Sequence, residues 1–413
     1  MDRQSSCVVA VVGAGIFGCS TAHHLQQAGI KDITLIDIGQ PGGGTTGAGA
    51  GFIGYWSAGY LEFFGRTGSI LQRYGNEFYI RLSDEGHEIE CRNNGHMYLA
   101  LTQGGYDKYI HRMVDHPLSP PGSRRLEPRE ISEVTGVVPA TEVVGAVLHP
   151  GAVQVETGLV VQVLARRFVE AGGKLRTETR VLGLDTKGGR VVGVRTDRGD
   201  VTADVVILAA GAWNNALLAE VDWQLPLLRA VASRVTTRKV GAPARMPAML
   251  IPEIGAWLRT KGDRYTYGSY AGYEALYRLD DKTAELGQPR VARLVDTMIE
   301  KLSPTLDPVF PNQNAGDVVE WVQGIPCYTP DRNSLAGPVP GCDGLFAMGG
   351  DNEAGVTHGP GLGRMIAELV VGTAPPFVDP RPYRLDRYAA HEFADERAVE
   401  AAMIPADSAL TTS

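Results

Sequence analysis

The stretch from Cys7 to Asp37, which begins CVVAVVGAGIFGC and ends DITLID, decides the fold. Its first residues form a short, apolar, β-branched run of the kind found in buried strands. Gly13, Gly15 and Gly18 follow in G-x-G-x-x-G spacing, and a helix-forming segment and a second strand come next. Such glycines permit a tight turn, close approach to a pyrophosphate and close helix–strand packing, while the terminal acid can bond a ribose hydroxyl. The pattern predicts a dinucleotide site; the alternative is a glycine-rich turn in another kind of α/β protein.

Length and charge narrow the class of protein. At 413 residues the chain is long for one hydrophobic core, so we expect two domains. The formal net charge of −8 argues against a nucleic-acid partner, because phosphate binding needs clustered Lys and Arg. No apolar run reaches the roughly 18 residues of a membrane span, and the first strand begins too early for a signal peptide. The five cysteines are scattered and lack metal-ligand spacing, so we expect no metal site and a reducing, cytoplasmic location. Because no membrane span is present in the sequence, we also expect no membrane contact.

A glycine-rich segment, GQPGGGTTGAGAG, occupies residues 39–51. So many small residues indicate either a flexible linker or backbone pressed against a ligand. Its place directly after the dinucleotide unit favours the second interpretation.

Four stretches, in this order and spacing, resemble those of a known family. They are Val12–Gly18, Ala209–Trp213, Tyr328–Asp331 and Gly349–Arg364. On these motifs the chain resembles the FAD-dependent amine and D-amino acid oxidase superfamily, and within it sarcosine oxidase, glycine oxidase and dimethylglycine dehydrogenase. The resemblance covers roughly residues 7–388.

The resemblance implies an FAD that lies extended across the first domain. Its adenosine would lie at Asp37 and Val181, its pyrophosphate at Gly15–Gly18, and its isoalloxazine between Thr45–Gly51 and Gly355–His358. A helix beginning near residues 359–363 would direct partial positive charge toward the flavin. The residues implied to bind the cofactor are Gly13, Gly15, Ile16, Phe17, Gly18, Asp37, Ile38, Thr45, Thr46, Ala48, Gly49, Ala50, Gly51, Val181, Ala210, Gly211, Trp213, Gly350, Gly355, Val356, Thr357 and His358.

The expected fold is α/β: a Rossmann-type FAD-binding domain beside a second, mainly antiparallel β-sheet substrate domain (α+β). Strand-rich sequence from residue 225 to 302, with strands near 231–237, 256–260 and 265–270 and a closing amphipathic helix, marks the second domain. We expect a discontinuous FAD-binding domain of residues 1–56, 146–222 and 318–390, a substrate domain of 57–145 and 223–317, and a C-terminal tail of 391–413.

Two departures from the family bear on flavin attachment. Some relatives bind the flavin covalently through a histidine or a cysteine, and these positions match Ala48 and Gly324 here. Cys327 lies three residues further on and is better explained as a buried, inert thiol. We therefore expect non-covalent FAD.

Other departures bear on the substrate. The cations with which relatives hold a substrate carboxylate match Pro326, Glu353 and Thr357, so all three are missing and one is inverted in sign. Glu353 would lie over the substrate face of the flavin, or it would point to solvent or cap the helix. Arg259 and Arg234 are the remaining candidate anion partners, although each residue type is more often found at a surface or strand edge.

The tentative substrate pocket is completed by aromatic and imidazole side chains. We place Tyr267 and Tyr270 in its wall, and His358 either against the flavin ring or in a loop hydrogen bond. The candidate substrate-pocket residues are therefore Glu353, Tyr267, Arg259 and His358.

The predicted activity is oxidation of a C–N bond of an amine or N-substituted amino compound to an imine, with hydride transfer to FAD. O2 or another acceptor would take the electrons. The lysine that relatives place near the flavin matches Thr266, so we expect slow reaction with O2. The alternatives are an amino acid oxidase with an arginine-held carboxylate, and a non-catalytic flavoprotein subunit.

Overall fold

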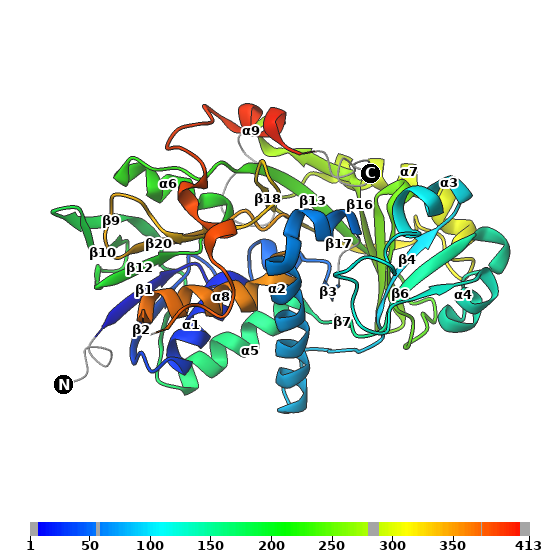
Figure 1. Ribbon diagram of the computed structural model, residues 1–413, viewed down its shortest axis with the longest axis horizontal. Helices are drawn as coiled ribbons and strands as arrows, with labels where there is room; N and C mark the ends of the chain where they lie inside the picture. Colours follow the sequence, from blue (N-terminus) through cyan, green and yellow to red (C-terminus); the bar gives the residue numbers. More distant parts are fainter. Residues whose placement is uncertain (1–6, 55–57, 280–288, 373, 405–413) are drawn as a thin grey trace.

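The computed structural model describes residues 7–54, 58–279, 289–372 and 374–404. Two β-sheets dominate it, and in Figure 1 the first, with its helices, occupies the left of the molecule and the second the right. The helix α2 (Ala58–Asp84), kinked at Gly65 where φ is 56°, stands between them.

The first sheet has six strands in the order β19-β20-β12-β1-β2-β8. All neighbouring pairs are parallel except β19 with β20. The strands are β1 (Val8–Val12), β2 (Asp32–Ile36), β8 (Lys174–Arg176), β12 (Val205–Leu208), β19 (Leu335–Pro338) and β20 (Leu345–Gly349). This is the Rossmann-type arrangement expected from the motifs, with β1 at a central position.

Alternate residues of β1 enter different hydrophobic cores, as a central strand requires. Val9 and Val11 pack against the helices α1 (Ile16–Gln27), α5 (Thr157–Glu170) and α8 (Gly355–Val371). Ala10 and Val12 face a three-stranded meander on the other side. The meander and the short helix beside it are β9 (Val181–Lys187), β10 (Arg190–Thr196), β11 (Val201–Thr202) and α6 (Asn214–Leu218).

The second sheet has nine strands, with β18 pairing off the main path onto β13. Its pairs are antiparallel except for β14 with β4. The strands, in spatial order, are β17 (Val318–Gly324), β13 (Leu228–Thr237), β16 (Arg264–Ala275), β15 (Ala256–Lys261), β14 (Ala248–Ile251), β4 (His96–Ala100), β6 (Gly145–His149), β5 (Arg124–Leu126) and, off the path, β18 (Cys327–Tyr328). The expected strands near 231–237, 256–260 and 265–270 are confirmed.

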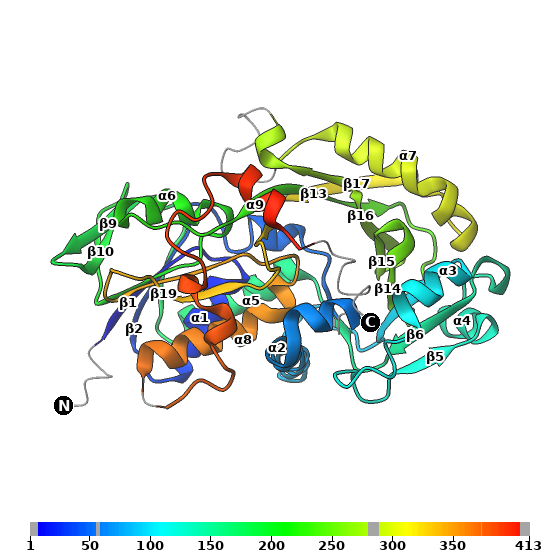
Figure 2. The ribbon, with the colours of Figure 1, turned by 45° about the horizontal axis from the view of Figure 1, so that its top comes forward.

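The helix α7 (Ala292–Val309) runs along the outer side of β16 and β17, as Figure 2 shows at the upper right. Leu294, Val295, Met298 and Leu302 are buried on its inner face, which confirms the predicted amphipathic helix. The remaining elements are β3 (Phe52–Ile53), which pairs with β7 (Val153–Gln154), and the helices α3 (Gln103–Gly105), α4 (Pro128–Thr135) and α9 (Glu396–Ala402). No helix in the described part of the chain is both long and apolar enough to cross a bilayer.

Three strands lie in a different sheet from the one expected. The strands β6, β17 and β18 fall in segments expected to belong to the FAD-binding domain, but β6 pairs antiparallel with β4, and β17 and β18 pair antiparallel with β13 of the second sheet. The sequences of β6 and β17 predict strands correctly. The strand with which each one pairs depends on which strand lies next to it in the folded protein, and the sequence of the strand itself does not specify this.

The helix α8 also differs from its expected bounds. It begins at Gly355, several residues before the expected start, and continues through Gly359, Pro360 and Gly363. A Cβ on Gly359 would lie 2.9 Å from Ile16 Cγ1, and one on Gly363 would lie 2.7 Å from a backbone nitrogen of α1. These glycines therefore allow α8 to cross α1 closely, and they do not mark the N-terminus of the helix.

Candidate cofactor and substrate site

A cavity of about 1070 Å³ runs from the glycine turn after β1 to the face of the second sheet. Cofactor and ligand sites typically measure about 300–1,000 Å³, so this volume suits a large ligand. Most of the residues predicted to bind the cofactor line it. They are Gly13, Gly15, Ile16, Phe17, Asp37, Ile38, Thr45, Thr46, Ala48, Gly49, Ala50, Gly51, Val181, Ala210, Gly211, Trp213, Gly355, Val356 and Thr357.

The glycine turn is shaped by two steric requirements. Gly13 has φ of +105°, and a Cβ there would lie 2.4 Å from the carbonyl oxygen of Ala209. A Cβ on Gly18 would lie 1.8 Å from the Gly13 carbonyl oxygen, so this residue allows α1 to pack on the turn without lining the cavity. Both positions demand glycine for backbone geometry.

The carboxylate of Asp37 holds this turn in place. It accepts the N–H of Ala14 at 2.6 Å and the N–H of Gly39 at 2.7 Å, one on each oxygen. The strand-end acid therefore ties together the two glycine-rich segments that line the cavity. Its bond to a ribose hydroxyl stays a prediction.

Two arginines of the second sheet fasten the loop of residues 45–51. Arg234 of β13 donates to the carbonyl oxygens of Gly49 (2.9 Å) and Gly47 (3.3 Å). Arg259 of β15 donates to the carbonyl oxygen of Ala50 at 2.5 Å and forms an ion pair with Glu156. The loop is thus a built wall of the cavity, which supports the interpretation as backbone pressed against a ligand.

Electrostatics agrees with this role for the arginines. Burial, followed by the charge of Arg259, lowers the pKa of Arg234 to about 10. Burial alone would raise the pKa of Glu156, but Arg259 and Lys261 outweigh it and hold that pKa below its usual value. Both arginines are therefore committed to protein partners, and neither presents an uncommitted guanidinium to a substrate carboxylate.

The opening turn of α8 faces the cavity. Gly355, Val356 and Thr357 line it, and Tyr79 donates to the carbonyl oxygen of Val356 at 2.7 Å. The N–H groups of a first helical turn lack intrahelical acceptors and carry partial positive charge. This end of α8 suits an anionic or electron-rich ring edge, as the flavin would present.

The residues present also fit FAD held without a covalent bond. Within the described part of the chain, the cavity lining contains neither a cysteine nor a histidine. A Cβ on Gly324 would lie 3.1 Å from Cβ of Ala48, so the two positions used by relatives for attachment meet here as two small residues. Cys327 is 1% exposed, lies outside the lining, and burial raises the pKa of its thiol well above the usual value.

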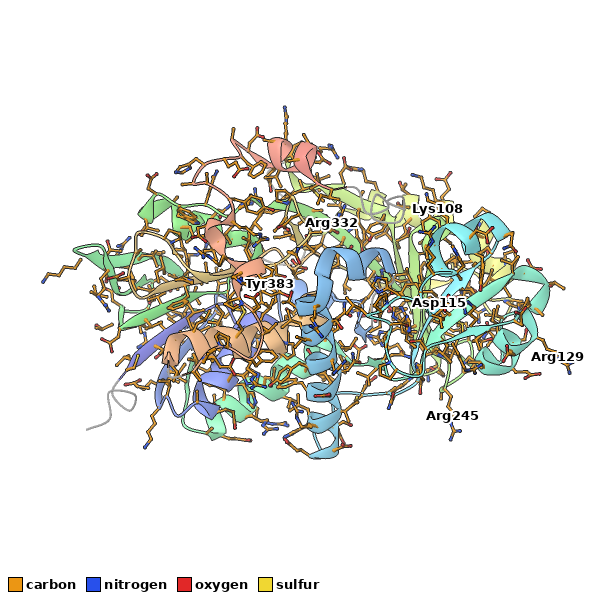
Figure 3. The ribbon with its side chains drawn as sticks, in the orientation of Figure 1. Lys108, Asp115, Arg129, Arg245, Arg332 and Tyr383 are labelled. Atoms are coloured by element: carbon orange, nitrogen blue, oxygen red, sulfur yellow. The ribbon has the colours of Figure 1, made fainter. Side chains whose placement is uncertain are left out.

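An acidic turn closes the opposite end of the cavity. Asp351 and Glu353 both line it, and Tyr273 donates a hydrogen bond to Glu353 at 2.6 Å. Burial raises the pKa of Glu353, although the hydroxyl of Tyr273 and the charge of Arg332 oppose the rise. Arg332 lies outside the lining, in the upper middle of Figure 3, and its Nε donates to the carbonyl oxygen of Ile404.

Aromatic rings surround this acidic end. Phe52 and Trp257 lie with ring centroids 5.7 Å apart, and Ala354 packs in the same cluster. Tyr270 and Tyr273 meet edge to face at 5.3 Å. All four rings line the cavity.

Three of the predicted substrate-pocket residues do not line the cavity. Tyr267 is buried on the other side of the second sheet, where its hydroxyl donates to the carbonyl oxygen of Ala315 and burial raises its pKa. Arg259 is occupied by the 45–51 loop and Glu156. His358 is buried inside α8, and burial lowers its pKa to about 3, so its imidazole is neutral.

Gly350 and Thr266 also lie away from the lining. Gly350, with φ of +64°, forms the turn after β20, where a Cβ would lie 2.3 Å from Thr329 Cγ2. Thr266 is buried within the sheet and donates to the carbonyl oxygen of Val235. Of the three positions matched to the missing cations, Pro326, Glu353 and Thr357, all line the cavity.

Tyr273 was not predicted, and a strand irregularity explains why. Between its pairings of Gly268 with Arg234 and of Tyr273 with Ala232, β16 shifts register against β13. Such bulges break the two-residue alternation by which sequence assigns side chains to faces. In the sequence, only Gly268 and Gly272 indicate that this strand is irregular.

Fold and cavity together define an α/β protein of the dinucleotide-binding flavoenzyme class. The model of the family described as "FAD dependent oxidoreductase" matches residues 9–369, and the chain belongs to this family. The family and fold predicted from the motifs are thereby confirmed.

Individual relatives are distant. The chain is 28% identical to glycine oxidase of Pseudomonas aeruginosa, over 91% of this chain and 97% of that protein. It is 26% identical to 4-methylaminobutanoate oxidase (formaldehyde-forming) of Paenarthrobacter nicotinovorans, over 92% of this chain, but spans only 46% of that relative. Glycine oxidase from Geobacillus kaustophilus has a similar structure, with a TM-score of 0.78 at 21% identity over 93% of this chain and 99% of that one.

Proposed function

We propose that this protein oxidises a C–N bond of an amine or N-substituted amino compound, using non-covalently bound FAD. The observation that carries the proposal is the continuous cavity, which joins the glycine turn and the α8 N-terminus to an end lined by aromatic and acidic side chains. Membership of the FAD dependent oxidoreductase family supports it. The names of two relatives, glycine oxidase and 4-methylaminobutanoate oxidase, point to amine nitrogen as the reacting group.

Residues of this chain would bind FAD along the glycine turn, the 45–51 loop and the first turn of α8. When bound, FAD supplies a two-electron acceptor for the hydrogen and electron pair of the C–H bond beside the substrate nitrogen, and the substrate leaves as an imine. The buried rings of Phe52 and Trp257 would exclude water, and Tyr270 would help orient the substrate. No residue is required to abstract a proton if the reacting nitrogen arrives neutral.

The electron acceptor is O2 or another electron acceptor in this proposal, and the cellular location is cytoplasmic. Cys7, Cys19, Cys91, Cys327 and Cys342 are all free thiols, which fits a reducing compartment. We also propose that the two sheets correspond to an FAD-binding and a substrate domain, with β6, β17 and β18 assigned to the latter.

The decisive experiment is anaerobic mixing of the FAD-loaded protein with amines, N-methyl amino acids and D-amino acids, followed by flavin absorbance. Bleaching by at least one amine is expected. No bleaching by any compound, with FAD tightly bound, would instead favour a non-catalytic flavoprotein subunit.

Non-covalent attachment has its own test. Acid precipitation should release the yellow colour into the supernatant, because Ala48 and Gly324 offer no atom for a flavin bond. Colour retained in the protein pellet would contradict this part of the proposal.

A further inference from the structure

The charged groups of the cavity are unevenly distributed. Of the arginines that line it, Arg180 lies beside Val181 and Arg234 is bonded to the carbonyl oxygens of Gly47 and Gly49. At the far end the charged groups in the lining are Asp351 and Glu353. This end is therefore negative.

The hydrogen-bond donors that reach these two carboxylates are neutral. Tyr273 donates its hydroxyl to Glu353, and Asp351 accepts the backbone N–H groups of Cys327 (2.8 Å) and Glu353 (3.2 Å). Neutral donors stabilise a carboxylate without cancelling its charge. The one cation that acts on Glu353 among the described residues is Arg332, which lies outside the lining, so the field inside this end of the cavity remains negative.

The acidic turn is held in a demanding conformation. Asn352 and Glu353 have φ of 46° and 62°, values that residues other than glycine rarely adopt. The Asn352 side chain locks the turn by accepting the N–H of Thr329 at 3.0 Å and donating to the carbonyl oxygen of Gly350 at 2.8 Å. Strained backbone that is locked in this way is characteristic of functional sites.

Aromatic faces complete the environment. Tyr270 and Tyr273 meet at right angles beside Glu353, and Trp257 lines the same end of the cavity. Rings attract cations through their negative faces, and carboxylates attract them through charge. The two features together favour an ammonium group and oppose a carboxylate.

We propose that Glu353 and Asp351, which share this end of the cavity with Tyr270, Tyr273 and Trp257, bind a second ammonium group of the substrate, which is therefore a diamine and not an amino acid. This inference rests on the proposed C–N oxidation, and it names the substrate class of the same site. The two acids bind the ammonium group at the end of the diamine that is not oxidised. The other nitrogen is not paired with these carboxylates, so it can lose its proton and react in the neutral form.

The electrostatic cost in the ligand-free protein supports this assignment. Burial, with the neighbouring charge of Glu353 as a further cause, raises the pKa of Asp351 to about 6. Two like charges at one site repel, and a bound cation relieves that repulsion. A substrate carboxylate would add a third negative charge.

The test uses three compounds of matched length that differ in one terminal group. N-methyl-1,3-diaminopropane, N-methylbutylamine and 4-methylaminobutanoate end in an ammonium, a methyl and a carboxylate group. Their Kd values are measured by anaerobic calorimetry at about pH 8 on holoenzyme whose FAD has been reduced beforehand, so that binding occurs without turnover. We expect the diamine to bind at least about tenfold more tightly than the monoamine, and about a hundredfold more tightly than the amino acid.

Glu353→Gln keeps the shape of the side chain and removes its charge, and it should reduce the diamine preference over the monoamine to about threefold or less. The matched control is Glu274→Gln, one residue from Tyr273, because Glu274 is paired with Arg293 at 2.6 Å outside the cavity. This control should retain the full preference. Tyr273→Phe keeps the ring, loses the bond to Glu353, and should weaken the preference in part.

Tighter binding of 4-methylaminobutanoate, or a diamine preference that survives in Glu353→Gln, would overturn the inference. Failure of the proposed function looks different: the binding order would hold, but no amine would reduce FAD in the oxidised holoenzyme.

Discussion

The two ends of the cavity differ in what lines them, backbone at one end and side chains at the other. The end near β1 is walled largely by backbone, from the glycine turn and the 39–51 segment, which lie within about forty residues of one another in the chain. The end under the second sheet is walled by side chains: Phe52 before α2, Trp257 on β15, Tyr273 on β16 and Glu353 before α8.

This difference matches two tasks. Backbone N–H groups and close approach of the main chain suit a cofactor shared by a whole family. Side chains from separate elements can change singly, so they suit selection among substrates. Arg234 and Arg259 join the two ends, because they come from the second sheet and bond the loop of the first.

The largest effect is expected from breaking the backbone-lined end. Gly15→Val should abolish FAD binding, because the added side chain would occupy space needed by the pyrophosphate and would also meet Thr46 Oγ1, 3.2 Å from a Cβ. Gly158→Ala, outside the cavity and with open space around its Cβ, is the control. FAD content after gel filtration, with circular dichroism to verify folding, decides the matter; a folded Gly15→Val protein that retains FAD would refute the assignment.

The junction between the two ends is tested by Glu156→Gln. This change leaves Arg259, 3% exposed, without its carboxylate partner, and removing one partner of a buried pair costs about 3–5 kcal/mol. The free energy of unfolding by urea, measured in excess FAD, should fall by about that amount.

The control for that experiment is an exposed pair. Glu133→Gln breaks the pair with Arg129, which projects from the helix α4 at the right of Figure 3. An exposed pair contributes about 0–1 kcal/mol, so the control should change little. Equal losses in the two variants would show that Arg259 does not depend on Glu156.

A third experiment measures how the acidic end of the cavity affects the rate at which O2 reoxidises the reduced flavin. A cation beside the flavin stabilises superoxide by a few kcal/mol, and here Lys261 is paired with Glu156 while Arg264 donates to the carbonyl oxygen of Thr237. We expect reoxidation by O2 to be about 10–1000 times slower than in flavin oxidases that have such a cation. Stopped-flow mixing of photoreduced enzyme with oxygenated buffer gives the rate, and Glu353→Gln should increase it; a fast wild-type reaction would contradict the expectation.

The smallest effect concerns pH and the acidic end. Because the pKa of Asp351 is raised to about 6, this group takes up a proton as pH falls through that value, and its negative charge is lost. Affinity for N-methyl-1,3-diaminopropane should therefore fall about tenfold between about pH 7.5 and pH 5. Asp351→Asn should flatten the profile, and an unchanged profile in that variant would assign the pH effect to another group.

The sequence by itself determined the backbone-lined end. The strand, the glycine turn, α1 and the strand-end acid lie within one short segment, and their geometry follows from local steric rules for glycine and from strand and helix periodicity. The four motifs also identified the family, and the match over residues 9–369 confirms it. The sequence also showed that Glu353 places a negative charge at a position where relatives place a positive one.

Tertiary structure decided the side-chain end. A register shift in β16 placed Tyr273 in the cavity, while Tyr267 lies in the core on the other side of the sheet. Arg259 appeared available in sequence, yet Glu156, more than a hundred residues away, neutralises it. Strand parity, partner choice and burial of charge depend on which elements meet in space, and local sequence does not carry that information.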